Sequence, residues 1–216
     1  MLGARRDLVK IDYVVKETAT LKQLVQETHV QVDLIRQERA EAFLLSRDVL
    51  TLPSFENRIE QAQEIAFTGV SLLRAINEYG DLFKRKLREE KCKLKFLLLS
   101  PESPATRLAE ANVSISYDVI KSDIQASIEH LKELKQLVSE EDKRTIEVRF
   151  LKCVPAYSSV IIDPELPSGS MIVELFAYKS KLRARPHFEL SRARDPFWWA
   201  YFYNAFQRLW SDSKPW

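Results

Sequence analysis

The apolar residues of this chain change their spacing near Pro53, and that change limits the folds available to it. Before Pro53 they recur at alternating intervals of four and three residues, which indicates one face of a helix. After Glu64 they occur in short runs separated by amphipathic stretches, which is typical of strands that alternate with helices. The sequence therefore predicts a helical segment over residues 1–52 and an α/β domain over residues 53–216.

The N-terminal segment is predicted to form one long helix from about Arg5 to Leu50, because no proline interrupts it. Its apolar stripe consists of Ile11, Val14, Leu21, Val25, Val32, Ile35 and Ala42. The same spacing also places Thr18, Thr28 and Arg39 on this apolar stripe. Polar residues at such positions make a coiled coil formed by this helix alone less favourable. The helix is therefore expected to pack on a neighbouring element or on a second copy, so a homodimer or a protein complex is predicted.

The α/β domain is predicted to contain five or six strands and several helices. The strand ranges are Glu64–Gly69, Lys93–Ser100, Thr145–Cys153, Ser158–Asp163, Ser170–Ala177 and Pro186–Leu190. The helix ranges are 53–62, Val70–Glu90, Asp118–Glu140 and a C-terminal helix that begins at Asp195-Pro196. The last three strands follow one another without helices between them.

All four tryptophans lie in the last 19 residues, within the C-terminal helix and just after it. An exposed aromatic helix of this kind would offer a stacking platform for bases or an anchor at a membrane interface. Its aromatic residues form two adjoining stripes that cover much of the helix, and such a helix usually closes a core. A core or a dimer interface is therefore the favoured interpretation.

The overall charge is close to neutral, with 33 Lys and Arg residues against 31 Asp and Glu residues. No apolar run approaches the roughly 20 residues needed to span a bilayer. Asp7 and Asp12 interrupt what would have to be the apolar part of a secretory signal. The protein is therefore expected to be cytoplasmic, without a membrane partner.

Two basic clusters lie within this nearly neutral chain. Residues 84–95 hold seven cations and two acids, and residues 179–194 hold six cations and one acid. The candidate nucleic-acid contacts are Lys84, Arg85, Lys86, Arg88, Arg183 and Arg185. Such clusters are also common on solvated surfaces, so nucleic-acid binding remains an alternative.

Several short sequence segments of the α/β domain resemble those of a known family. They are Phe67-Thr68-Gly69-Val70-Ser71-Leu72, Lys95–Pro104, Ile146–Phe150, Ser159–Asp163, Val173–Lys179, Arg185–Phe188 and Phe206–Trp210. In this order of elements, residues 64–212 resemble a phospholipase D-like domain of the catalytically degenerate bacterial kind. The resemblance implies a mixed sheet flanked by helices and a pseudoenzyme that acts as a sensor or protein-interaction module in a regulatory or antiviral defence system.

Active members of that superfamily use the motif H-x-K-x-x-x-x-D, in which the histidine attacks phosphorus and the lysine binds the phosphoryl oxygens. In this chain the corresponding positions are Tyr157 and Ser159, ahead of Asp163. The only literal His-x-Lys is formed by His130 and Lys132, within a predicted amphipathic helix. Phosphoryl transfer through a phosphohistidine needs both the imidazole and the cation, so no enzymatic activity is expected.

One end of the predicted sheet is the candidate ligand site. The residues expected there are Gly69, Ser71, Arg74, Glu174, Tyr178, Lys179 and His187. Backbone N–H groups at a strand-to-helix turn bind phosphate well, so a phosphorylated or nucleotide ligand is predicted, without a metal or cofactor. The alternatives are a hydrolase or nuclease that uses Glu174, Lys179 and His187, or purely structural roles, with Glu174 and Lys179 as a surface ion pair.

Overall fold

In the computed structural model the chain divides into two units, Met1–Ala42 and Phe43–Trp216. The described residues are 22, 25, 26, 28, 43–44, 53–90, 92–113, 115–138, 145–176, 178–179 and 185–216. Most of the predicted N-terminal helix lies outside them, and the four described positions of the first unit are helical.

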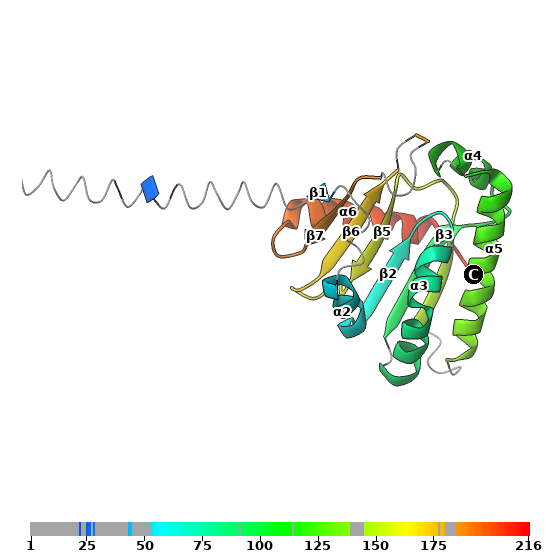
Figure 1. The fold of residues 1–216 in the computed structure, drawn as a ribbon, viewed down its shortest axis with the longest axis horizontal. Coiled ribbons are helices and arrows are strands. Elements are labelled where there is room, and N and C mark those ends of the chain that lie inside the picture. Colours follow the sequence, from blue (N-terminus) through cyan, green and yellow to red (C-terminus); the bar gives the residue numbers. More distant parts are fainter. Residues whose placement is uncertain are drawn as a thin grey trace, which may run out of the picture. The chain divides into compact units, whose positions relative to one another are not determined.

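The second unit is a mixed α/β domain built on one sheet (Figure 1). Its strands are β1 (Phe43–Leu44), β2 (Glu64–Thr68), β3 (Lys93–Leu99), β4 (Ile146–Leu151), β5 (Tyr157–Ile162), β6 (Ser170–Leu175), β7 (His187–Ser191) and β8 (Lys214–Pro215). Their order in the described sheet is β1-β7-β6-β5-β2-β3-β4-β8. β2, β3 and β4 are parallel, and every other pairing is antiparallel. A mixed sheet flanked by helices was predicted, and this coarse fold class is confirmed.

Helices cover both faces of this sheet (Figure 1). They are α2 (Pro53–Gln61), α3 (Leu73–Arg85) with its π-helical extension η2 (Lys86–Glu90), α4 (Pro104–Val113), α5 (Tyr117–Gln136) and α6 (Pro196–Asp212). α3 packs on one face, where the rings of Phe83 and Phe67 meet at 5.4 Å. α6 packs on the opposite face, where the rings of Phe202 and Phe188 also meet at 5.4 Å.

Burial of β3 on both faces explains its nearly continuous apolar sequence. Leu94 and Phe96 through Leu99 are fully buried, and Phe96 stacks on Phe67 at 5.4 Å. α6 supplies the core of the other face with Trp199, Phe202 and Phe206. This confirms that the aromatic helix closes a core, although Phe197, Trp198 and Tyr201 of the same helix remain exposed.

Three elements differ from the prediction. Phe43–Leu44 form a strand where a helix was predicted, because their backbone pairs with the edge strand β7. α4 was not predicted, although Ser103 Oγ accepts the N–H of Ala105 at 3.2 Å and a proline follows Ser103 directly, as at many helix starts. β8 was missed because its two residues are too short for a periodic pattern.

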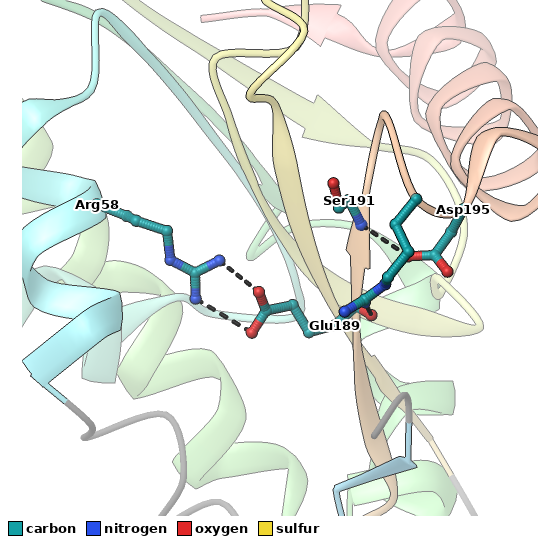
Figure 2. Close-up of polar contacts among 5 residues, drawn as sticks. Arg58, Glu189, Ser191 and Asp195 are labelled. Carbon is teal, nitrogen blue, oxygen red and sulfur yellow. Dashed lines mark hydrogen bonds and ion pairs between the residues drawn. The ribbon is translucent and has the colours of Figure 1, made fainter. Parts of the chain in front are cut away.

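Two hydrogen bonds between charged side chains join α2 to β7 (Figure 2). Arg58 donates from Nη1 to Glu189 Oε1 at 2.5 Å and from Nη2 to Glu189 Oε2 at 3.1 Å. Further along, Asp195 Oδ2 accepts the N–H of Ser191 at 2.9 Å, which closes the turn between β7 and α6. Asp195 and Pro196 occupy the N-cap and first position of α6, as the sequence predicted.

Candidate ligand-binding site

A cavity of about 630 Å³ opens where β2 ends and α3 begins. The strands β2, β5 and β6 contribute to its lining, together with the first turns of α3 and residues of α5. This position, outside the carboxyl end of a parallel strand and beside the start of the following helix, is where open α/β sheets commonly bind ligands.

The turn between β2 and α3 has an unusual backbone. Leu72 is the N-cap of α3 and has a φ of 64°, in the left-handed region that costs about 1–2 kcal/mol for a residue with a side chain. A Cβ at Gly69 would lie 2.8 Å from Leu72 Cδ2, so a larger residue there would require the Leu72 side chain to move. No side chain caps α3, and its first turn holds no acidic residue. The backbone N–H groups of that turn, which have no acceptor within the helix, therefore lend partial positive charge to this wall of the cavity.

The polar interior of the cavity is formed by Glu174 at the end of β6 and Arg185 just before β7. Arg185 Nη1 lies 3.2 Å from Glu174 Oε1, and both side chains are almost completely buried. Ser158, opposite Glu174 in the sheet, donates its hydroxyl to the same oxygen at 3.4 Å. The guanidinium also lies over the ring of Phe176, with Cζ 4.9 Å from the ring centre. These contacts hold the carboxylate and the guanidinium side by side.

The described part of the lining carries more negative than positive charge. Among these residues the cations are Arg74 and Arg185 and the carboxylates are Glu78, Asp123 and Glu174, which sum to −1. Arg74 and Glu78 form an exposed ion pair at 3.6 Å, whereas Asp123 makes no ion pair with a described residue. Most of the remaining wall is apolar. A ligand with an apolar body and few charges fits such a lining.

Four of the seven predicted site residues line the cavity, namely Gly69, Ser71, Arg74 and Glu174. The backbone N–H of Gly69 donates to Leu97 O at 3.0 Å and extends the pairing of β2 with β3. That N–H group is therefore unable to bind phosphate, which corrects the expectation at this position.

The other three predicted residues lie elsewhere. Tyr178 is 74% exposed, and Lys179 Nζ lies 5.3 Å from its ring centre. Lys179 also donates its backbone N–H to Ala111 O at 3.2 Å and forms no surface pair with Glu174. His187 opposes Glu174 across β6 and β7 but is fully buried, and its Nε2 has no hydrogen-bond partner among the described residues.

Sequence reasoning missed Ser158 and Asp123 as cavity residues and assigned Arg185 to a nucleic-acid surface. Ser158 meets Glu174 only through the register of β5 and β6, for which no local signal exists. Asp123 lies on the apolar-striped α5, where its position one residue before the buried Ile124 gave no indication of a cavity. Arg185 was recognisable only as part of a charge cluster.

Most of the candidate nucleic-acid contacts in the first basic cluster bind neighbouring residues of the fold. Lys84 pairs with Asp81 at 3.5 Å, and Arg85 pairs with Glu60 at 2.6 Å. The hydrogen bond and charge of Arg85 hold the pKa of Glu60 below its usual value. Lys86 is fully buried and donates to Glu60 O at 2.5 Å, so it is not part of a surface. Arg88 is exposed, and Arg183 lies outside the described residues.

Tyr157, Ser159 and Asp163, which the sequence analysis compared with the phosphohydrolase motif, make contacts within the fold. Tyr157 packs on Phe202 with ring centres 5.2 Å apart, and burial raises its pKa to about 12, with a further contribution from Tyr201. Ser159 is buried on the same face of β5. Asp163 Oδ1 accepts the backbone N–H groups of Gln63 and Glu64 at 2.7 and 2.9 Å, and this fixes the start of β2.

Within the described ranges, no three residues of the types that bind metals gather into a cluster. The helices described here also include none that is long and apolar enough to cross a membrane.

The fold and this cavity define a mixed α/β domain with a small-molecule-sized pocket at the end of its sheet. Residues 44–216 match the family model of DUF5919, a domain of unknown function, and the chain belongs to that family. No curated protein sequence matches the chain.

Proposed function

We propose that residues 43–216 form a non-catalytic phospholipase D-like domain that senses a small phosphorylated or nucleotide ligand for a bacterial regulatory or defence system. The observation that carries the proposal is the cavity beside α3, whose volume of about 630 Å³ lies in the usual range for small-molecule sites. It combines apolar walls, a buried acid–base pair and a helix start without a side-chain cap. The left-handed Leu72 supports the proposal, because strained residues concentrate at ligand sites.

The absence of the histidine and lysine at Tyr157 and Ser159 supports binding rather than hydrolysis. Leu72, Ser71 and Arg74 belong to one short segment that both contacts the cavity and starts α3. Binding of an anion at this segment would stabilise the strained turn, since the backbone N–H groups there gain acceptors. The same segment would report ligand occupancy to α3.

Mass spectrometry of molecules released from the purified full chain tests this proposal, followed by thermal unfolding with each released molecule and with a panel of mononucleotides. We expect a ligand that raises the unfolding temperature of the wild-type chain and of Arg88→Ala, but not of Ser71→Trp, whose ring narrows the cavity. A ligand that stabilises Ser71→Trp equally would overturn the site. Turnover of a generic phosphodiester that Glu174→Ala abolishes would favour the hydrolase alternative.

We also propose that the segment before β1 mediates association with a second copy. Its apolar stripe of four-and-three spacing supports this, because such a stripe gains stability when it is buried against a partner. Light scattering of the full chain and of residues 43–216 tests the idea, and a cut at residue 42 keeps β1 in the sheet. We expect the full chain to have the mass of a dimer and residues 43–216 to have the mass of a monomer. The same association state for both would contradict the proposal.

A further inference from the structure

The charges that line the cavity beside α3 do not cancel, although most of them are paired within the fold. Glu174 and Arg185 bind each other at 3.2 Å, and Arg74 and Glu78 form an ion pair at 3.6 Å. Both pairs are neutral, so the excess negative charge of the described lining is that of Asp123. The Asp123 carboxylate forms no ion pair and no side-chain hydrogen bond with a described residue.

Asp123 lies on the inward side of α5. Ile120, one turn earlier, and Ile124, the next residue, are both buried. Asp123 itself is half-buried and lines the cavity together with Ile120. A carboxylate in this position has lost part of its hydration and therefore gains more from a nearby cation than a fully exposed one does. The cavity thus offers a place for a positively charged group of a ligand.

The start of α3 offers the opposite charge in the same cavity. No side chain caps this helix, and its first turn holds no acidic residue. The N–H of Ile76 donates to Leu72 O at 3.0 Å, and the N–H groups of residues 73–75 before it have no acceptor within the helix. Ser71 and Arg74 line the cavity beside these groups. An anionic group of a ligand is stabilised at this position.

From these two positions we infer that the ligand is a zwitterion, a phosphate monoester that also carries an ammonium group, and this inference rests on the proposed function. The phosphate binds the N–H groups at the start of α3, and the ammonium group binds Asp123 on α5. The two charges belong to different helices, so the body of the ligand separates them. Val160 and Ile172 of the sheet line the cavity with apolar side chains that suit such a body.

Ligands with only one of the two charges match the cavity less well. A phosphate without a cation adds negative charge to a lining that already sums to −1, and in a partly dry cavity this repulsion is weakly screened. A polyphosphate increases the same repulsion. An amine without a phosphate leaves the N–H groups at the start of α3 without an acceptor. The zwitterion satisfies both positions and leaves the two ion pairs of the lining intact.

Calorimetric titration of the full chain with pyridoxamine 5′-phosphate and pyridoxine 5′-phosphate tests the inference. The two probes share one phosphate and one flat ring, and they differ only in the amino group that replaces a hydroxyl group. This amino group is protonated near neutral pH, so the pyridoxamine compound should bind about 10-fold more tightly. Equal affinities, tighter binding of the pyridoxine compound, or binding of neither probe would overturn the inference.

Two variants assign the preference to its residue. Asp123→Asn keeps the size of the side chain but removes its charge, so the preference for the pyridoxamine compound should disappear. Asp118→Asn is the matched control, because it makes the same change in net charge on an exposed part of α5 outside the cavity lining, and it should keep the preference. Circular dichroism confirms the folding of both variants. A preference that survives in folded Asp123→Asn would overturn the assignment.

The same measurements separate this inference from the proposed function. If neither probe binds, but a co-purified molecule or a mononucleotide does and its binding is lost in Ser71→Trp, the zwitterion inference fails and the ligand-sensing function stands. If no molecule binds the cavity in either experiment, both fail.

Discussion

Arg185 and Glu174 form an ion pair of 3.2 Å that is almost entirely buried, although the two residues come from different segments at the end of the sheet. The backbone brings them together, since Leu175 donates its N–H to Pro186 O at 2.9 Å directly beside the pair. Taking two charges out of water is costly, and the pair occupies a cavity wall rather than a packed core. This position at a cavity wall is the one that the proposed ligand site requires.

Breaking the pair from one side should be strongly destabilising. In Arg185→Met the buried Glu174 carboxylate loses its 3.2 Å contact with the guanidinium, and we expect a loss of about 3–5 kcal/mol in the free energy of unfolding. The double variant Glu174→Leu with Arg185→Met should recover much of that loss, because no charge remains buried. Urea unfolding of the three chains measures both effects. A double variant as unstable as the single one would indicate that the pair itself stabilises the fold.

Neighbouring tryptophans of α6 should differ sharply in their contribution to stability. Trp199 is 4% exposed and Trp198 is 54% exposed. Trp199→Ala leaves a large cavity beneath the helix and should cost about 3–5 kcal/mol. Trp198→Ala is its matched control and should cost about 1 kcal/mol or less. Comparable losses in urea unfolding would show that the exposed ring is buried in solution, for example by self-association.

Two buried hydroxyls face each other across β2 and β5 without a hydrogen-bond partner among the described residues. Thr68 and Ser159 are register partners, and their side-chain oxygens are buried. A buried hydroxyl without a partner costs about 1–3 kcal/mol, so Thr68→Val should keep or raise the stability. The measurement is urea unfolding at neutral pH. A loss of more than about 1 kcal/mol would reveal a buried water bound to these hydroxyls.

The sequence allowed prediction of the elements whose apolar pattern is local. The alternation in β4 and β5 and the stripe of α5 are set by burial against one layer, so their ranges agree with the structure within a few residues. α4 was not predicted, although Ser103 and Pro104 together are typical of a helix start. Strand order was not predicted, since nonlocal pairing leaves no periodic signal.

The candidate site likewise has one part that local sequence predicted and one part that it did not. Gly69, Ser71 and Arg74 belong to one strand-to-helix turn, so their common location follows from adjacent residues. The partner of Glu174 depends instead on how the chain returns from β6 to β7, and the sequence suggested Lys179 rather than Arg185. Charge clusters were misleading for a related reason, because Lys86 is buried and Arg85 faces Glu60 only in the folded chain.

The link between α2 and β7 should make a modest and measurable contribution to stability. Arg58 and Glu189 are about one-third exposed, and their two parallel contacts favour a fixed geometry. A double-mutant cycle with Arg58→Ala and Glu189→Ala should give a coupling of about 1 kcal/mol that shrinks at high salt. The exposed Arg85–Glu60 pair is the matched control and should give a smaller coupling. A coupling below that of the control would contradict a fixed Arg58–Glu189 contact.

Alkaline pH should destabilise the fold through Tyr157. Burial raises the pKa of this phenol from 10.0 to about 12 because the charged phenolate is poorly solvated beneath α6. The unfolded chain therefore loses its proton near pH 10, whereas the folded chain keeps it until about pH 12. Stability is unaffected by this group below pH 10 and falls as the pH rises from 10 towards 12, by about 1.4 kcal/mol per pH unit.

The variant Tyr157→Phe isolates this effect from the titration of lysines, which both chains share. Its free energy of unfolding should differ from that of the wild type by a constant amount between about pH 7 and 9. Above pH 10 the difference should shift in favour of the variant, because phenylalanine has no proton for the unfolded state to release. Urea unfolding across this range measures the difference. A difference that stays constant up to pH 12 would mean that water reaches Tyr157 in the folded protein, and that the packing of α6 on β5 is looser than the contact with Phe202 implies.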